Sequence, residues 1–260
     1  MIFLYSKLLV GVIVALLVAV LPTHKANSSV RATVRATVGV TDELGKLNVY
    51  LQSRGIAMNL EGIREHLLML DNSGHDWTLA EKLIAQLGSE RFSNRQSAEK
   101  SLTELTVLPI ELLREASLGH EVEKAYRAKR ILERTIPDQT KTLEKVLRSA
   151  ELLELSGITE EIVKSVISFP YDRRIVQSAQ RTIAVAVTRE NINFLSAQMT
   201  PETTASVREI SIHGLRILKE NSLSDRFEFW ARNHLLEENI RLEAALALAD
   251  LGDRRSLSLL

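Results

Sequence analysis

The sequence contains no cysteine, and this absence removes several classes of site at once. A chain without thiols has no disulfide framework, no thiolate metal site, no cysteine nucleophile and no c-type haem attachment. Its 5 prolines and 11 glycines among 260 residues are too few for a loop-rich or fibrous protein. Aromatic residues make up only 5%, whereas leucine, alanine and isoleucine are abundant. These features favour helices packed through aliphatic side chains over a β-sandwich.

Neither sign of charge is in excess, because 33 Lys and Arg residues balance 33 Asp and Glu residues. Proteins that bind nucleic acid usually carry a strong basic excess. We therefore expect no nucleic-acid partner, and a nucleic-acid binder of the helical-repeat glycosylase kind is disfavoured. The hydrophobic fraction of 45% is enough for a sizeable buried core.

Residues 1–26 have the order of a targeting segment. Lys7 precedes an apolar run from Leu8 to Leu21, and Pro22 begins a polar exit. This order is typical of a secretory signal peptide. The residues before Lys7 are also apolar, so the total apolar length approaches the about 20 residues of a membrane span. Two alternatives stay open, a cleaved signal or an uncleaved anchor over residues 1–22. Both predict a periplasmic or secreted protein whose membrane contact, if any, is this anchor.

Residues 27–43 contain a four-residue duplication, Val30–Thr33 followed by Val34–Thr37. The segment is rich in serine and threonine and mildly basic. It could contact an anionic membrane surface, but such a composition is more typical of a spacer. We expect a flexible tether over 27–43, and a folded domain over 44–260.

The remainder of the chain has apolar residues at three- and four-residue spacing, which predicts helices. One pattern recurs, with a small residue at +3 and leucine or a similar residue at +7 and +10 from an anchor position. The anchors are Arg95, Ala125, Val176, Arg208 and Arg241. Their separations are 30, 51, 32 and 33 residues. Three of the four match the period of two-helix solenoid repeats.

The longer interval needs additional helix. We expect helices over Thr140–Leu155 and Thr159–Phe169, with Gly157 in the C-terminal cap between them. Second helices of the repeats are expected over Pro109–Ser117, Glu190–Gln198, Leu223–His234 and from Arg254 onward.

The last repeat resembles the HEAT-repeat family, in which a basic residue, an alanine and a leucine precede Leu-Gly-Asp at the end of the first helix. Arg241, Ala244, Leu248 and Leu251-Gly252-Asp253 follow this order. The segment Leu79–Phe92 with the residues after it is similar to a HEAT-type module of exported bacterial proteins. It departs from that pattern at Thr106-Val107-Leu108, where the family has a glycine before the proline turn. The resemblance implies an all-α fold, an α-solenoid of stacked antiparallel helix pairs forming a HEAT-like superhelix, and no chemistry of its own.

No motif predicts catalysis. The segment Ser97–Lys100 has the spacing of an acyl-enzyme serine and lysine, but Ala98 occupies the buried repeat position, so Ser97 should face solvent. No glycine-rich phosphate loop is present, and the six histidines form no i, i+4 pair. We expect no catalytic residue, no cofactor and no metal. A pocket lined by converging acids and His66 or His75 would favour the alternative, an enzyme domain.

Two groups of residues are candidates for binding another protein. Phe227 and Trp230 share a helix face and form part of the only aromatic cluster, although a core role is the simpler interpretation. Arg127, Arg130 and Arg134 lie in the densest basic stretch, which could instead be a solvated face with i, i+4 ion pairs.

The function that we expect is a non-catalytic scaffold or adaptor in the cell envelope. The alternative is an accessory subunit or domain of an extracytoplasmic enzyme complex. Because Leu257–Leu260 would leave an apolar terminal edge, weak homo-association at that edge is also expected.

Overall fold

The computed structural model describes residues 28–71, 76–105, 107–167, 169 and 172–259. Every regular element in these residues is helical, so the all-α prediction is confirmed. By internal contacts the chain divides into two units, Met1–Gly55 and Ile56–Leu260. The helices are α2 (Ser28–Gln52), α3 (Leu60–Met69), α4 (Thr78–Gln86), α5 (Phe92–Thr103), α6 (Ile110–Ser117), α7 (Val122–Leu152), α8 (Thr159–Ile167), α9 (Arg173–Ala186), α10 (Ile192–Ala197), α11 (Ala205–Leu218), α12 (Ser224–Arg232) and α13 (Glu238–Asp250), with short 3₁₀ turns η2 (Arg189–Asn191), η3 (Asn221–Leu223) and η4 (Arg254–Ser258).

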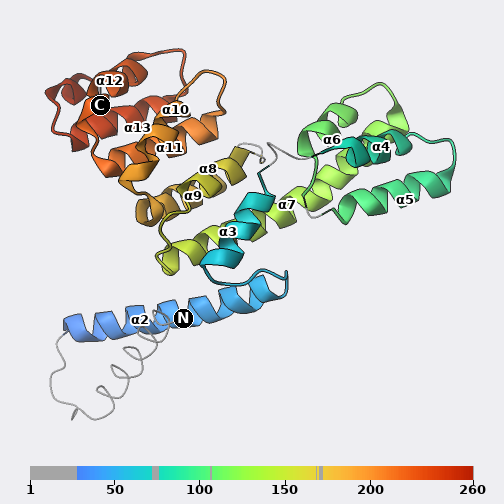
Figure 1. Ribbon diagram of the computed structural model, residues 1–260, viewed down its shortest axis with the longest axis horizontal. Coiled ribbons are helices and arrows are strands. Elements are labelled where there is room, and N and C mark those ends of the chain that lie inside the picture. Colours follow the sequence, from blue (N-terminus) through green and yellow to red (C-terminus); the bar gives the residue numbers. More distant parts are fainter. Residues whose placement is uncertain (1–27, 72–75, 106, 168, 170–171, 260) are drawn as a thin grey trace, which may run out of the picture. The chain divides into compact units, whose positions relative to one another are not determined.

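In the first unit, helix α2 covers the segment for which the sequence predicted a flexible tether (Figure 1). The helix is continuous across position 44, so the boundary expected there lies inside an element. No proline occurs from Asn27 to Gln52, so nothing removes a donor from the helical ladder. Among the helices that the structure describes, none combines the length and apolar character of a membrane span. The expected targeting segment, residues 1–26, lies outside the described residues.

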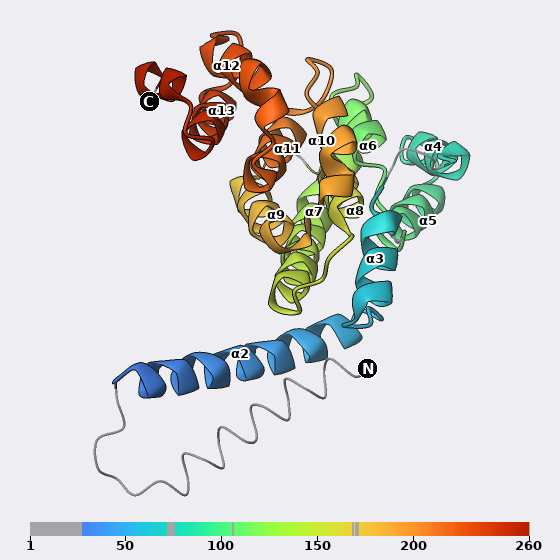
Figure 2. The ribbon, with the colours of Figure 1, turned by 60° about the vertical axis from the view of Figure 1, so that its left-hand side comes forward.

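The second unit is organised around the long helix α7 (Figure 2). Helices α4, α5 and α6 pack against its N-terminal half. Their shared core holds Ala98 and Leu102 of α5, Leu113 of α6, and Ala128 and Ile131 of α7, all fully buried. The candidate binding surface lies on α5 and α7 of this group.

The C-terminal half of α7 begins a layer in which α9, α11 and α13 follow side by side. Helices α8, α10 and α12 pack on this layer. The +3 and +7 positions of the repeat pattern are buried in this layer. Ala179, Ile183, Ser211, Leu215, Ala244 and Leu248 each have 0% exposure.

The prediction of a separate helix from Thr140 to Leu155 is wrong. Helix α7 runs unbroken from Val122 to Leu152 through Pro137. A proline inside a helix costs about 3 kcal/mol, since it removes one hydrogen bond and crowds the preceding turn. Burial on both sides of Pro137 offsets this cost: Ala128 and Ile131 belong to one core, and Leu143 and Leu147 are buried in the other half. The 51-residue interval is therefore one long helix followed by α8.

Helix α3 packs against α8 and α7 rather than against its sequence neighbour α4. The Arg64 guanidinium donates to Glu161 at 3.1 Å and to the carbonyl of Gly157 at 3.0 Å. A simple stack in chain order would not place α3 there.

The turn after α7 uses Glu154, not Gly157, as its left-handed residue. Glu154 has φ 53°, and the next amide, of Leu155, donates to the carbonyl of Ala150 at 3.0 Å. This pattern is a Schellman cap, which usually has glycine at the left-handed position. Gly157 also has positive φ, but it lies in the loop that leads to α8.

Replacing Glu154 by glycine should stabilise the fold. Glu154→Gly relieves the contact between Cβ and backbone in the left-handed conformation, worth about 1 kcal/mol. The matched variant Glu154→Ala keeps Cβ and removes the rest of the side chain. We expect urea denaturation to give the glycine variant the higher free energy of unfolding of the two, and equal values would contradict the cap.

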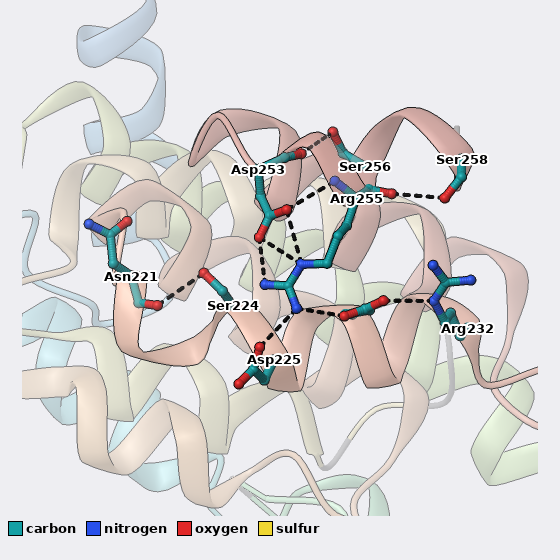
Figure 3. A network of polar contacts seen from close by, with 9 residues as sticks. Asn221, Ser224, Asp225, Arg232, Asp253, Arg255, Ser256 and Ser258 are labelled. Atoms are coloured by element: carbon teal, nitrogen blue, oxygen red, sulfur yellow. Dashed lines mark hydrogen bonds and ion pairs between the residues drawn. The ribbon is translucent and has the colours of Figure 1, made fainter.

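The C-terminal turn η4 is held against α12 by one arginine (Figure 3). The Arg255 guanidinium donates to Asp225 at 2.8 Å, to Glu228 at 2.6 Å and to Asp253 at 2.6 Å. Leu257 in this turn remains 82% exposed. Self-association at this edge stays a prediction.

Candidate protein-binding surface on α5 and α7

Phe227 and Trp230, the aromatic candidates for partner binding, belong to the core, which was the simpler of the two interpretations from sequence. Phe227 is fully buried and Trp230 is 5% exposed. Their rings meet edge to face, with centroids 5.8 Å apart. Side chains as buried as these have little surface left for a direct contact with a partner. Phe229 between them is 64% exposed.

Two of the three arginines proposed from sequence, Arg127 and Arg130, converge on a glutamate that α5 carries toward α7. Glu99 follows the buried position Ala98, so its carboxylate enters the seam between the two helices and is 8% exposed. The Arg127 guanidinium donates to it at 2.7 Å, and Arg130 donates to its other oxygen at 2.8 Å. Two arginines one turn apart on α7 therefore share a single carboxylate.

A second glutamate extends this network at the surface. Glu123 accepts a hydrogen bond from Arg127 at 2.6 Å and forms an ion pair with Arg95 of α5 at 3.2 Å. The bond from Arg127 lowers the pKa of Glu123. The bond to Glu99 raises the pKa of Arg130. Three arginines and two glutamates thus form one network with a net charge of +1.

Two aromatic rings cover the edges of this network. Phe92, at the start of α5, is 60% exposed, and the guanidinium carbons of Arg95 and Arg127 lie 5.7 and 5.8 Å from its ring centre. Tyr126 is 59% exposed, and the guanidinium of Arg130 lies 5.6 Å from its ring centre. We name this set the α5–α7 surface; its members are Phe92, Arg95, Glu99, Glu123, Tyr126, Arg127 and Arg130.

The remainder of the basic stretch consists mainly of ordinary surface charges. Arg134 is exposed and lies one turn beyond the network. Lys129 pairs with Glu133 at 3.9 Å, and Arg148 pairs with Glu151 at 2.9 Å. The exposed pair of Lys129 and Glu133 fits the interpretation of a solvated helix face with i, i+4 ion pairs, whereas the pair of Arg148 and Glu151 is only partly exposed.

Within the described part of the chain, the other candidate residues from the sequence are not brought together into a site. No three His, Asp or Glu side chains there are grouped as metal ligands. His66 is partly buried on α3, and burial lowers its pKa. His75 lies outside the described residues. Ser97 is exposed, as expected.

No protein-family model matches this sequence, and no curated protein or solved structure matches it either.

Sequence reasoning missed both exposed aromatic residues of this surface. Phe92 stands at a helix start and Tyr126 stands inside the basic stretch. The one signal available was the presence of aromatic rings within reach of several arginines, a combination that is enriched at protein interfaces.

Proposed function

We propose that this chain is a non-catalytic scaffold that binds another protein through the α5–α7 surface. The observation that carries the proposal is the pair of exposed rings, Phe92 and Tyr126, each stacked by an arginine of the network. Aromatic and arginine side chains dominate the energetic centres of protein interfaces. Arginines already fixed by carboxylates lose little side-chain entropy on binding, which favours association.

The partner should present acidic and apolar groups. The network has a net positive charge, and the exposed Arg134 adds to it on the same helix. Exposed rings offer apolar contact area beside that charge. An acidic partner would gain long-range attraction as well as contacts, so its association rate should fall with added salt.

We also propose that the helical layers are HEAT-like solenoid units. Polar contacts between neighbouring helices link residues close to 30 apart, as repeats in register would. Gln180 contacts Glu209 29 residues on, and Glu209 contacts Asn239 30 residues on. His213 contacts Glu243, again 30 residues on. Such arrays generally serve as binding platforms.

The apolar N-terminal stretch supports an extracytoplasmic location, periplasmic or secreted. The alternative role is an accessory subunit or domain of an extracytoplasmic enzyme complex. The two roles are distinguished by whether the captured partner's catalytic rate changes when this chain is bound.

The double variant Phe92→Ala with Tyr126→Ala should bind the partner much more weakly than the unaltered chain does. Each exposed ring is expected to contribute about 1–2 kcal/mol of binding free energy, so affinity should fall roughly 30-fold or more. The measurement is quantitative mass spectrometry of proteins cross-linked to the tagged full chain in the cell envelope. The partner recovered by the unaltered chain should disappear from the double variant.

Phe229→Ala is the matched control, since it also removes an exposed ring. It should retain the partner. Equal recovery from the double variant and the unaltered chain would contradict the proposed surface, provided circular dichroism shows that both are folded.

A further inference from the structure

A cavity of about 340 Å³ opens between α4, α6 and the start of α7, formed by residues other than those of the α5–α7 surface. It is lined by Glu81, Ile84, Ala85, Leu112, Glu115, Ala116, Gly119, His120, Glu121 and Lys124. Its volume is at the lower end for ligand sites. It therefore suits one long side chain better than a large cofactor.

The lining combines aliphatic groups with carboxylates. Ile84, Ala85, Leu112 and Ala116 supply the apolar part. Glu81 of α4 and Glu115 of α6 are both exposed and line this cavity from two different helices.

The charges of this cavity are not balanced by its own residues. The Lys124 ammonium donates to Glu121 at 3.4 Å. Neither Glu81 nor Glu115 has an ion pair or a side-chain hydrogen bond with any residue that the structure describes. Two carboxylates beside an apolar cavity are complementary to a cation on an aliphatic stem.

The neighbouring residues extend the apolar character outward. Leu118 and Val122, adjacent in sequence to lining residues, are 84% and 83% exposed. The cavity could also accept a small free molecule such as a diamine, but this ligand would not cover Leu118 and Val122. A peptide could cover them with the apolar residues that flank its arginine. The surroundings thus favour a protein segment over a small amine.

We propose that this cavity binds an arginine side chain from a basic, partly apolar segment of a protein partner. The methylene stem lies against Leu112 and Ala116, and the guanidinium donates to Glu81 and Glu115. Arginine fits better than lysine because its planar group carries five donors, enough for both carboxylates. This site goes beyond the proposed function, since it uses different residues and opposite charge, and it can hold when the α5–α7 surface fails.

The test is an NMR titration of the full chain with the peptide acetyl-Val-Arg-Val-amide. The matched peptide replaces arginine by citrulline, which has nearly the same shape and no charge. The arginine peptide should shift the amide signals of Gly119 and His120 and bind at least tenfold more tightly than the citrulline peptide. Butylguanidinium, which carries a single guanidinium on an aliphatic stem without flanking residues, should bind several-fold more weakly than the arginine peptide.

The double variant Glu81→Gln with Glu115→Gln should reduce peptide affinity at least tenfold. Glu65→Gln removes an exposed carboxylate on α3 and should leave the affinity unchanged. Equal binding of the two peptides, or unchanged affinity in the double variant, would overturn the proposal. Butylguanidinium binding as tight as the arginine peptide would overturn the assignment to a protein partner.

Discussion

Phe227→Ala should lower the free energy of unfolding by about 4 kcal/mol, the usual loss when a buried phenylalanine is truncated. The side chain has 0% exposure, and its ring packs edge to face against Trp230. Truncation leaves a cavity beneath α12 and removes that ring contact. Urea denaturation followed by circular dichroism measures the change directly.

The matched control for this variant lies two residues further along the same helix. Phe229 is 64% exposed, so Phe229→Ala should change the free energy of unfolding by less than about 0.5 kcal/mol. A stable Phe227→Ala protein that had lost its partner would show that this ring belongs to an interface rather than to the core.

Glu99→Gln should destabilise the fold by about 3 kcal/mol. The substitution removes the charge that Arg127 and Arg130 share and turns an amide donor or a weaker acceptor toward them. Arg127 is only 7% exposed, so its charge would be left underpaired in the seam between α5 and α7. Breaking a buried ion pair from one side is costly because the other charge stays desolvated. Thermal and urea unfolding of the purified chain give the magnitude.

An exposed glutamate on the same long helix serves as the control. Glu133 pairs with Lys129 at 3.9 Å, and both side chains are more than 60% exposed. Glu133→Gln should therefore change stability by less than about 0.5 kcal/mol. Equal effects of the two substitutions would mean that Glu99 is not the buried centre of the network.

The phase of the helices could be predicted from sequence, because periodicity reports directly which face is buried. Ala98, Leu102, Ala244 and Leu248 were assigned to the core from spacing alone, and all four are fully buried. Helix termination was harder to predict. Local rules discouraged a helix through Pro137 and favoured a glycine cap, whereas tertiary burial sustains α7 and Glu154 adopts the left-handed conformation.

The site could be predicted only in part. The sequence singled out Arg127 and Arg130, since their density on one helix is visible in the chain. It could not pair them with Glu99, which lies 28 residues before Arg127 and meets it only through packing of α5 on α7. For the same reason its aromatic candidates for an interface were Phe227 and Trp230, for which it preferred a core role, and it did not single out Phe92 and Tyr126. Exposure of a ring depends on which neighbouring helix covers it.

If the α5–α7 surface contacts another protein, site-specific photo-crosslinking at that surface should capture the partner. The photoreactive residue p-benzoylphenylalanine would replace Tyr126 in the full chain, and Phe229 in a control, in the organism that encodes it. Both positions are exposed, at 59% and 64%. We expect one discrete adduct with a second protein from position 126 and none from position 229. No adduct from position 126, or the same adduct from both positions, would contradict it.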